Sequence, residues 1–157
     1  MTKVYFATDH AGLEAKNALM SYVASLGYET EDCGAFSFDK DDDYPDFIIP
    51  WARKVAADPG SFGVVLGASG QGEAMGANRV PGARAALYYG SPAKTQTDMA
   101  GKELDMIAST REHNNANILS LGSRFLREEE MEAAVKIFLS TPFPGEERHA
   151  RRVEKLG

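Results

Sequence analysis

The loop Gly67 to Glu73, with three spaced glycines and one carboxylate at its end, holds the groups of this chain best suited to chemistry. The apolar run Gly63 to Leu66 before it is typical of a strand buried on both faces, and helical character follows from Glu73 to Asn78. The loop therefore lies at a helix N-terminus, with free N–H groups and the positive end of the helix dipole. Such a place stabilises an enolate, an oxyanion or a phosphate. Glu73 is either a base acting there or an acid favoured by the dipole alone.

Three known loop motifs do not fit these residues. The phosphate loop of nucleotide hydrolases requires Gly-Lys-Ser/Thr where this chain has Gly72-Glu73-Ala74. The dinucleotide fingerprint fails by one residue, because Gly76 comes one position too late after Gly72. The nucleophile elbow of serine hydrolases begins at Gly67, but Gln71 stands where its last glycine belongs. The residues thus argue against these three functions.

Apolar strand-like runs alternate with amphipathic stretches along the chain. Strands are predicted at residues 4–7, 28–32, 63–66, 84–88 and 118–121, and helices at 13–26, 46–57, from 73, within 93–109, and at 128–140. This order predicts an α/β fold, a three-layer α/β/α Rossmann-like domain with a five-stranded parallel sheet. The length and the absence of a linker indicate a single domain over residues 1–157.

Polar residues follow four of the predicted strand regions: Asp9-His10, Asp43-Tyr44, Ser69 to Glu73, and Ser123-Arg124. Because ligands of such sheets bind outside the carboxyl ends of the strands, we expect these side chains to converge at one edge. The acidic run 39–43 lacks the glycine and the terminal glutamate of a calcium loop. We interpret it as a solvated acidic turn that caps the next helix.

Charge and cysteine content exclude several classes of partner. A net charge of −6 argues against a nucleic acid, whose binding depends on lysine and arginine. No apolar run approaches the roughly 20 residues that span a bilayer. The single cysteine, Cys33, and the lack of a signal-like segment favour a cytoplasmic location. The charge reverses locally where Arg148, Arg151 and Arg152 crowd around His149, a candidate site for a small anion.

Seven short motifs, in this order and at these spacings, resemble the ribose 5-phosphate isomerase B family, which includes galactose 6-phosphate and allose 6-phosphate isomerases. They are Ala7–Gly12, Asp43–Pro45, Gly67–Glu73, Ala77–Gly82, Arg111–Asn117, Gly122–Arg124 and Arg148–Glu154. The resemblance runs nearly from end to end. It implies an aldose-ketose isomerase of a phosphorylated sugar that works through an enediolate, with no metal and no organic cofactor.

The family uses one of two bases, a cysteine just before the glycine-rich loop or a glutamate just after it. Leu66 stands in the cysteine position, so the resemblance implies that Glu73 takes the proton from C2 of the open-chain aldose and returns it to C1. Ser69 and the N–H groups around Gly70 to Gly72 would hold the oxyanion. Burial would raise the pKa of Glu73 and the helix terminus would lower it, and the sequence leaves the balance open.

The resemblance also assigns the other site residues. His113 would assist opening of the furanose ring, Asn114 would lie near the sugar, and Asp9 would order its hydroxyls. The phosphate would be held by His10, Arg124, Arg148 and Arg152. Arginine suits this task because its planar fork makes two hydrogen bonds to one phosphate. Tyr44, Gly70 and Gly72 complete the expected substrate-binding set.

Active sites of this family lie between subunits, so the resemblance implies a homodimer with shared sites, either by itself or as half of a tetramer. The neighbour of the Glu73 loop would supply His113 and Arg124. The segment 90–109 is longer than in typical glutamate-type members, and is either an extended surface helix or a part of the sugar pocket or dimer seam.

The leading expectation is conversion of ribose 5-phosphate to ribulose 5-phosphate, a reaction of the pentose phosphate pathway. One alternative is an isomerase of a four-carbon or six-carbon phosphosugar. The other, from a different class, is a module that binds a phosphosugar without turning it over.

Overall fold

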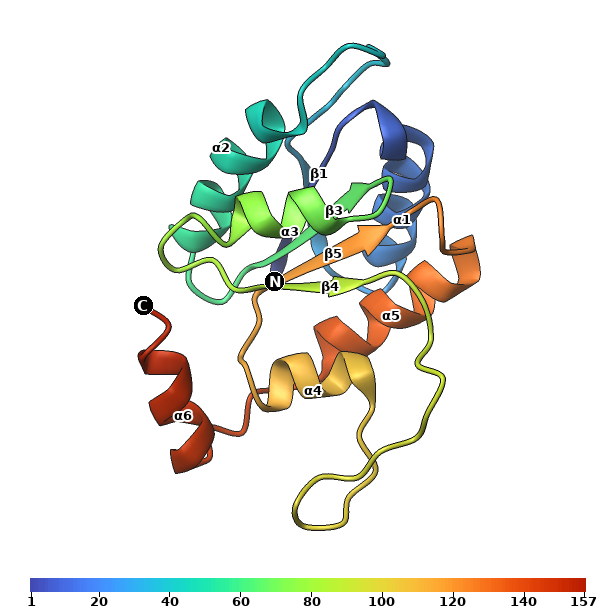
Figure 1. Ribbon diagram of the computed structural model, residues 1–157. Helices are drawn as coiled ribbons and strands as arrows, with labels where there is room; N and C mark the ends of the chain where they lie inside the picture. Colours follow the sequence, from blue (N-terminus) through green and yellow to red (C-terminus); the bar gives the residue numbers. More distant parts are fainter.

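A five-stranded parallel sheet forms the centre of the computed structural model, which describes all 157 residues (Figure 1). The strands are β1 (Lys3–Thr8), β2 (Glu29–Asp32), β3 (Phe62–Gly67), β4 (Ala85–Tyr88) and β5 (Ile118–Gly122), in the order β2-β1-β3-β5-β4. The helices are α1 (Leu13–Ser25), α2 (Tyr44–Ala56), α3 (Gln71–Ala77), α4 (Met106–Glu112), α5 (Glu128–Ser140) and α6 (Glu147–Glu154), and a 3₁₀ turn, His10–Gly12, precedes α1. None of these helices has the length and apolar composition that crossing a lipid bilayer requires.

Both faces of the sheet are covered, which confirms the three-layer α/β/α prediction. Val4 and Phe6 of β1 point into a core shared with α1, α4 and α5. Tyr5 and Ala7 point to the opposite face, into a core shared with α2 and α3. Figure 1 shows α2 and α3 on that face of the sheet. Successive side chains of a strand alternate between faces, so strands that are apolar throughout feed both cores at once.

The prediction of a helix within residues 93–109 is wrong for most of that segment. Only Met106–Glu112 is helical, and an antiparallel bridge pairs Thr97 with Glu103 before it. The Asp98 side chain accepts hydrogen bonds from the N–H groups of Ala100 and Lys102, at 2.8 and 3.0 Å. Aspartate held in this way favours a turn over a helix. The segment is therefore a loop that closes on itself and not an extended surface helix.

A buried lysine fixes the loop between β2 and α2, residues 33–43. Lys16 of α1 is fully buried, and its Nζ donates to Asp32 at 2.6 Å and to the Ala35 carbonyl at 2.7 Å. A charge taken out of water in this way needs such partners. The start of the 33–43 loop is thereby tied to α1, and its end is tied to α2.

Trp51 of α2 packs over a strand glycine at the centre of the second core. An ideal Cβ on Gly63 would lie 2.6 Å from the Trp51 ring and 3.0 Å from both Ile118 and Val55. The Trp51 indole N–H also donates to the Tyr5 carbonyl at 3.0 Å, which prevents the ring from moving aside. Gly63 therefore provides the space that brings α2 down onto the sheet.

We expect Gly63→Ala to lower the free energy of unfolding by about 1–3 kcal/mol, the usual cost of forcing an extra methyl group into a filled core. Urea unfolding measures this effect. Gly90→Ala is the matched control, because nothing lies within 4 Å of a Cβ at that position. An equal urea midpoint for the two variants would contradict this account of α2 docking.

Candidate active site

Glu73 folds back from the first turn of α3 over the end of β3. A Cβ on Gly67 would overlap the Glu73 carboxylate, so this arrangement requires glycine at the last position of the strand. The Gly67 carbonyl is fixed in turn by Ser123, whose N–H and hydroxyl donate to it at 2.8 and 2.9 Å. Neither Gly67 nor Ser123 is among the site residues that the family resemblance implies. The signal for both was their place inside the motifs Gly67–Glu73 and Gly122–Arg124.

The start of α3 presents two unused N–H groups. Gly70, in the left-handed region at φ +75°, precedes the helix, and a Cβ there would lie 2.9 Å from the Leu121 backbone. The N–H groups of Gly70 and Gly72 donate to no other group of the chain, whereas the Ser69 hydroxyl accepts from Gln71 N–H at 3.3 Å. Amides free in this way are suited to an anion or a developing oxyanion.

Tyr44 reaches the same loop from α2. A Cβ on Gly72 would lie 2.7 Å from the Tyr44 ring, so the ring packs directly on the glycine. The predicted grouping of Tyr44 with Gly70 and Gly72 is therefore present in one chain.

Burial decides the balance of effects on Glu73 that the sequence left open. The side chain is 5% exposed, and desolvation raises its pKa above the ordinary glutamate value. Its own backbone N–H lowers the pKa by a smaller amount, and the negative charge of Asp9 raises it. A carboxylate made more basic in this way is better able to take a proton from carbon near neutral pH.

Residues after β1 and β5 meet the Glu73 loop at the carboxyl edge of the sheet, as predicted. Asp9 is buried and accepts from the Ala11 N–H at 2.9 Å. The Arg124 N–H donates to the Ala68 carbonyl at 3.1 Å, and the positive charge of Arg124 acts to lower the pKa of His10. We call the group Asp9, His10, Tyr44, Ser69 to Glu73 and Arg124 the carboxyl-edge cluster.

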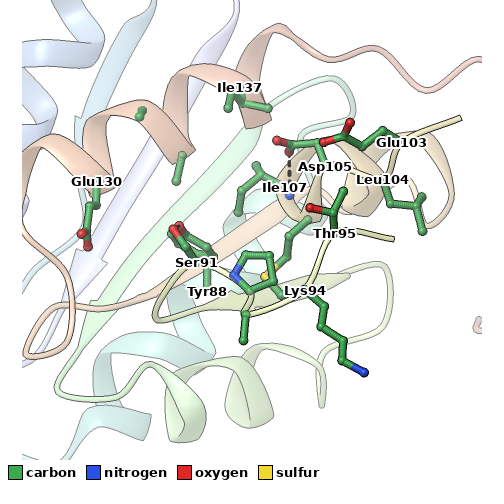
Figure 2. A pocket seen from close by; sticks show the side chains of 15 residues that line it. Tyr88, Ser91, Lys94, Thr95, Glu103, Leu104, Asp105, Ile107, Glu130 and Ile137 are labelled. Atoms are coloured by element: carbon green, nitrogen blue, oxygen red, sulfur yellow. Dashed lines mark hydrogen bonds between the residues drawn. The ribbon is translucent and has the colours of Figure 1, made fainter. Parts of the chain in front are cut away.

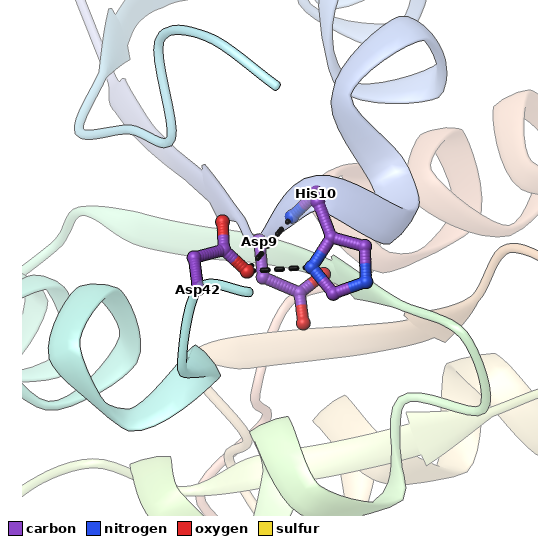
Figure 3. Close-up of side chains that lie close together, drawn as sticks. All are labelled: Asp9, His10 and Asp42. Atoms are coloured by element: carbon purple, nitrogen blue, oxygen red, sulfur yellow. Dashed lines mark hydrogen bonds and ion pairs between the residues drawn. The ribbon is translucent and has the colours of Figure 1, made fainter. Parts of the chain in front are cut away.

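The assignment of Arg124 to the neighbouring subunit needs correction. Arg124 belongs with the Glu73 loop of its own chain, because β5 lies directly beside β3 in the sheet and the two strands end together. The interpretation of the acidic run 39–43 as wholly solvated is also wrong. The Asp42 side chain is only 7% exposed and binds the His10 ring, while Asp43 occupies the N-cap position of α2 without a side-chain cap bond (Figure 3).

His113 and the arginines of α6 form a second group. His113, Arg148 and Arg152 line a cavity of about 290 Å³ together with His149 and Asp98. The His113 and His149 rings stack, with centroids 4.4 Å apart and planes at 16°. His149, to which the family resemblance assigned no role, is therefore part of this group. We call His113, Arg148, His149 and Arg152 the tail cluster.

The tail cluster and the carboxyl-edge cluster lie at opposite ends of the sheet within one chain. His113 precedes β5 and Arg124 follows it, so the five-residue strand, about 17 Å long, lies between them. Asn114 belongs to neither cluster. It lines a cavity of about 660 Å³ beside β4, together with Leu156 and the C-terminal Gly157. One chain therefore does not bring all the predicted site residues together.

A further cavity, of about 530 Å³, lies between the 91–107 segment and α5. Its lining includes Ser91, Lys94, Glu103 and Glu130, and no residue of the predicted site (Figure 2). Cavity size alone thus does not identify the reactive part of this molecule.

Known proteins are similar to this chain over nearly its whole length. A sequence model of the family Ribose/Galactose Isomerase matches residues 4–156. Ribose-5-phosphate isomerase B of Mycobacterium tuberculosis is 42% identical over 154 residues, which cover 98% of this chain and 87% of the relative.

Solved structures superpose along nearly the whole chain. Ribose 5-phosphate isomerase B from Anaplasma phagocytophilum has a TM-score of 0.84 at 36% identity, covering 100% of this chain and 97% of its own. The enzyme of that name from Mycoplasma genitalium, solved with bound ribulose-5-phosphate, has a TM-score of 0.84 at 33% identity, covering 99% and 93%.

The raised pKa of Glu73 predicts a particular dependence of stability on pH. The folded carboxyl holds its proton more tightly than the unfolded one, so its contribution to stability is complete below the ordinary glutamate pKa and is lost as pH rises through the raised pKa. The neutral amide of Glu73→Gln avoids this loss. We expect this variant to have a higher urea midpoint than wild type at about pH 7.5, and a similar one at about pH 4.

Glu103→Gln, at an exposed position whose side chain forms no ion pair, is the control and should follow wild type at both pH values. A urea midpoint of Glu73→Gln at or below that of wild type at the higher pH would contradict the role given to burial.

Proposed function

The chain belongs to the ribose/galactose isomerase family, and on that premise we propose that it interconverts ribose 5-phosphate and ribulose 5-phosphate with Glu73 as the base. It is an aldose-ketose isomerase. The observation that carries the proposed mechanism is the buried Glu73 carboxylate beside the free N–H groups of Gly70 and Gly72.

Proton transfer between C1 and C2 requires a base and a group that stabilises the enediolate. Glu73 takes the C2 proton of the open-chain aldose, so that the C2–H electron pair forms the C1–C2 double bond and the carbonyl π electrons move onto the C1 oxygen. Glu73 then returns the proton to C1, and the C2 hydroxyl proton passes to the C1 oxygen, which leaves the C2 carbonyl of the ketose. The N–H groups of Gly70 and Gly72, with the Ser69 hydroxyl, hold the C1 oxygen as its negative charge develops. Fixed donors of this kind contribute about 3–4 kcal/mol each to transition-state stability. Asp9, buried next to Glu73, orders the sugar hydroxyls.

Phosphate binding draws on both clusters. His10 and Arg124 of one chain approach the phosphate from the carboxyl edge, and Arg148 and Arg152 come from the tail cluster of a second chain. His113 of that second chain assists opening of the furanose ring, with Asn114 beside it. The support is the separation of the two clusters, since each holds only part of the required chemistry. The active form is therefore a homodimer with two shared sites, and a tetramer would pair such dimers.

The location of the enzyme follows from its chemistry. Its one cysteine, Cys33, is unpaired, in keeping with a reducing compartment. We place the enzyme in the cytoplasm, where phosphorylated pentoses are interconverted.

We expect Glu73→Gln to lose about 10²–10⁴-fold in kcat, the usual contribution of a positioned general base. Wild type should exchange the C2 proton of ribose 5-phosphate with deuterium oxide, followed by NMR, at an unchanged rate in chelator. The variant should not exchange it, although inorganic phosphate should still bind. Saturable phosphosugar binding by wild type without any proton exchange would instead identify a binding module.

Comparison of kcat/KM for four-, five- and six-carbon phosphosugars tests the choice of substrate.

Shared sites predict complementation between inactive variants. Glu73→Gln and His113→Asn damage different clusters, so a mixed dimer has one site with both defects and one site with none. After unfolding and refolding together in equal amounts, about a quarter of wild-type activity should return, since half of the dimers are mixed and each has one intact site. Each variant refolded alone is the control. Activity no greater than the sum of the two controls would argue that each chain carries its own complete site.

A further inference from the structure

Asp42 is the one acidic residue of the run 39–43 that leaves the solvent. Its side chain is 7% exposed, whereas that of Asp41 is 79% exposed. The turn that presents it is closed by Asp39, whose side chain accepts from the Asp41 N–H at 3.0 Å and whose carbonyl accepts from the Asp42 N–H at 3.2 Å. Lys16 anchors the other end of the same loop. The position of Asp42 is thus fixed by the fold.

The Asp42 carboxylate contacts His10 at two atoms. Its Oδ1 lies 2.6 Å from the ring Nδ1 and 3.4 Å from the backbone N of the same residue (Figure 3). Phe38, from the same loop, meets the His10 ring edge-on with centroids 6.0 Å apart. The second carboxylate oxygen of Asp42 is buried and accepts no hydrogen bond. The 33–43 loop therefore sets the orientation of a ring that is itself 27% exposed.

This contact determines where the protons of His10 lie. A carboxylate only accepts hydrogen bonds, so Nδ1 must carry a hydrogen and Nε2 is left without a partner in the chain. A phosphate dianion also only accepts, so Nε2 can bind it only when it too carries a hydrogen. Phosphate binding at His10 therefore requires the charged, doubly protonated ring.

Three charged groups face the ring, and they do not all act in the same direction. The hydrogen bond to Asp42 is the largest influence and raises the pKa of His10, and the charge of Asp9 raises it further. Desolvation and the charge of Arg124 lower it. The net shift is upward, which keeps the ring charged to a higher pH than an ordinary histidine.

We propose that Asp42 is a positioning residue that holds the His10 ring with Nε2–H free for the substrate phosphate. The inference rests on the proposed function, because it takes His10 as a phosphate-binding residue. Asp42 lies outside the motif Asp43–Pro45 that carries the family resemblance. Its role follows from the contact with His10 alone.

The first test compares Asp42→Asn with the matched control Asp41→Asn, which removes the same charge from the neighbouring exposed position. At about pH 8, Asp42→Asn should raise KM about tenfold, because the ring loses the partner that favours its charged form, and should change kcat less than about threefold. Asp41→Asn should match wild type in both constants. Equal KM values for the two variants, or a loss confined to kcat, would overturn the proposal.

The second test separates this role from a merely structural one. Lowering the pH to about 6 protonates His10 without help from Asp42, so the KM ratio of Asp42→Asn to wild type should shrink toward one. NMR titration of the histidine rings should give His10 a lower pKa in Asp42→Asn than in wild type and Asp41→Asn. A KM ratio that stays constant with pH, or an unchanged His10 pKa, would contradict the assigned role.

Titration with inorganic phosphate, followed at the His10 resonances, requires no turnover and tests the anion site by itself. Phosphate binding weakened in Asp42→Asn supports the proposal even if wild type fails to isomerise ribose 5-phosphate, an outcome that would refute the proposed function alone. The ligand atoms of Asp9, His10 and Asp42 lie within 4.8 Å of one another and have the types that bind divalent metals. Loss of phosphate binding in chelator would identify a metal site there and would overturn the proposal.

Discussion

The contact between the Glu73 carboxylate and Gly67 is the constraint on which the site depends. A strand that ends in glycine lets the side chain of the following helix return over the strand end, where any larger residue would exclude it. That return buries the carboxylate beside the free amides of the same loop. Burial raises the pKa of Glu73, so one packing arrangement supplies both the place of the base and its basicity.

The sheet and most helices could be predicted because local preference and tertiary packing agree in them. Residues 128–140 illustrate this, since three glutamates favour the helix start and an apolar face follows with helical spacing. The helix prediction for the segment 93–109 failed because its polar residues show little helical periodicity. A single side chain, that of Asp98, shapes the turn there instead. Such turn chemistry outweighs helix propensity where no core contact supports the helix.

Site residues could be predicted from the sequence when they lie within one motif or directly follow a strand. Glu73, Asp9 and His10 meet that condition, and the structure places them together. Asp42 does not, because nothing in a run of four aspartates and a lysine tells which one a neighbouring loop will bury. The sequence likewise could not show that Arg124 lies beside the Glu73 loop of its own chain. That placement depends on the spatial order of the strands and not on their order along the chain.

The separation of the tail cluster from the carboxyl-edge cluster has a thermodynamic consequence for the proposed dimer. A phosphosugar that touches both clusters is a ligand of two chains at once, and it binds the associated state better than the separated one. By linkage, substrate then tightens the association of subunits by the same factor by which association tightens the binding of substrate. At high dilution the apparent affinity for substrate would therefore depend on the concentration of the enzyme itself.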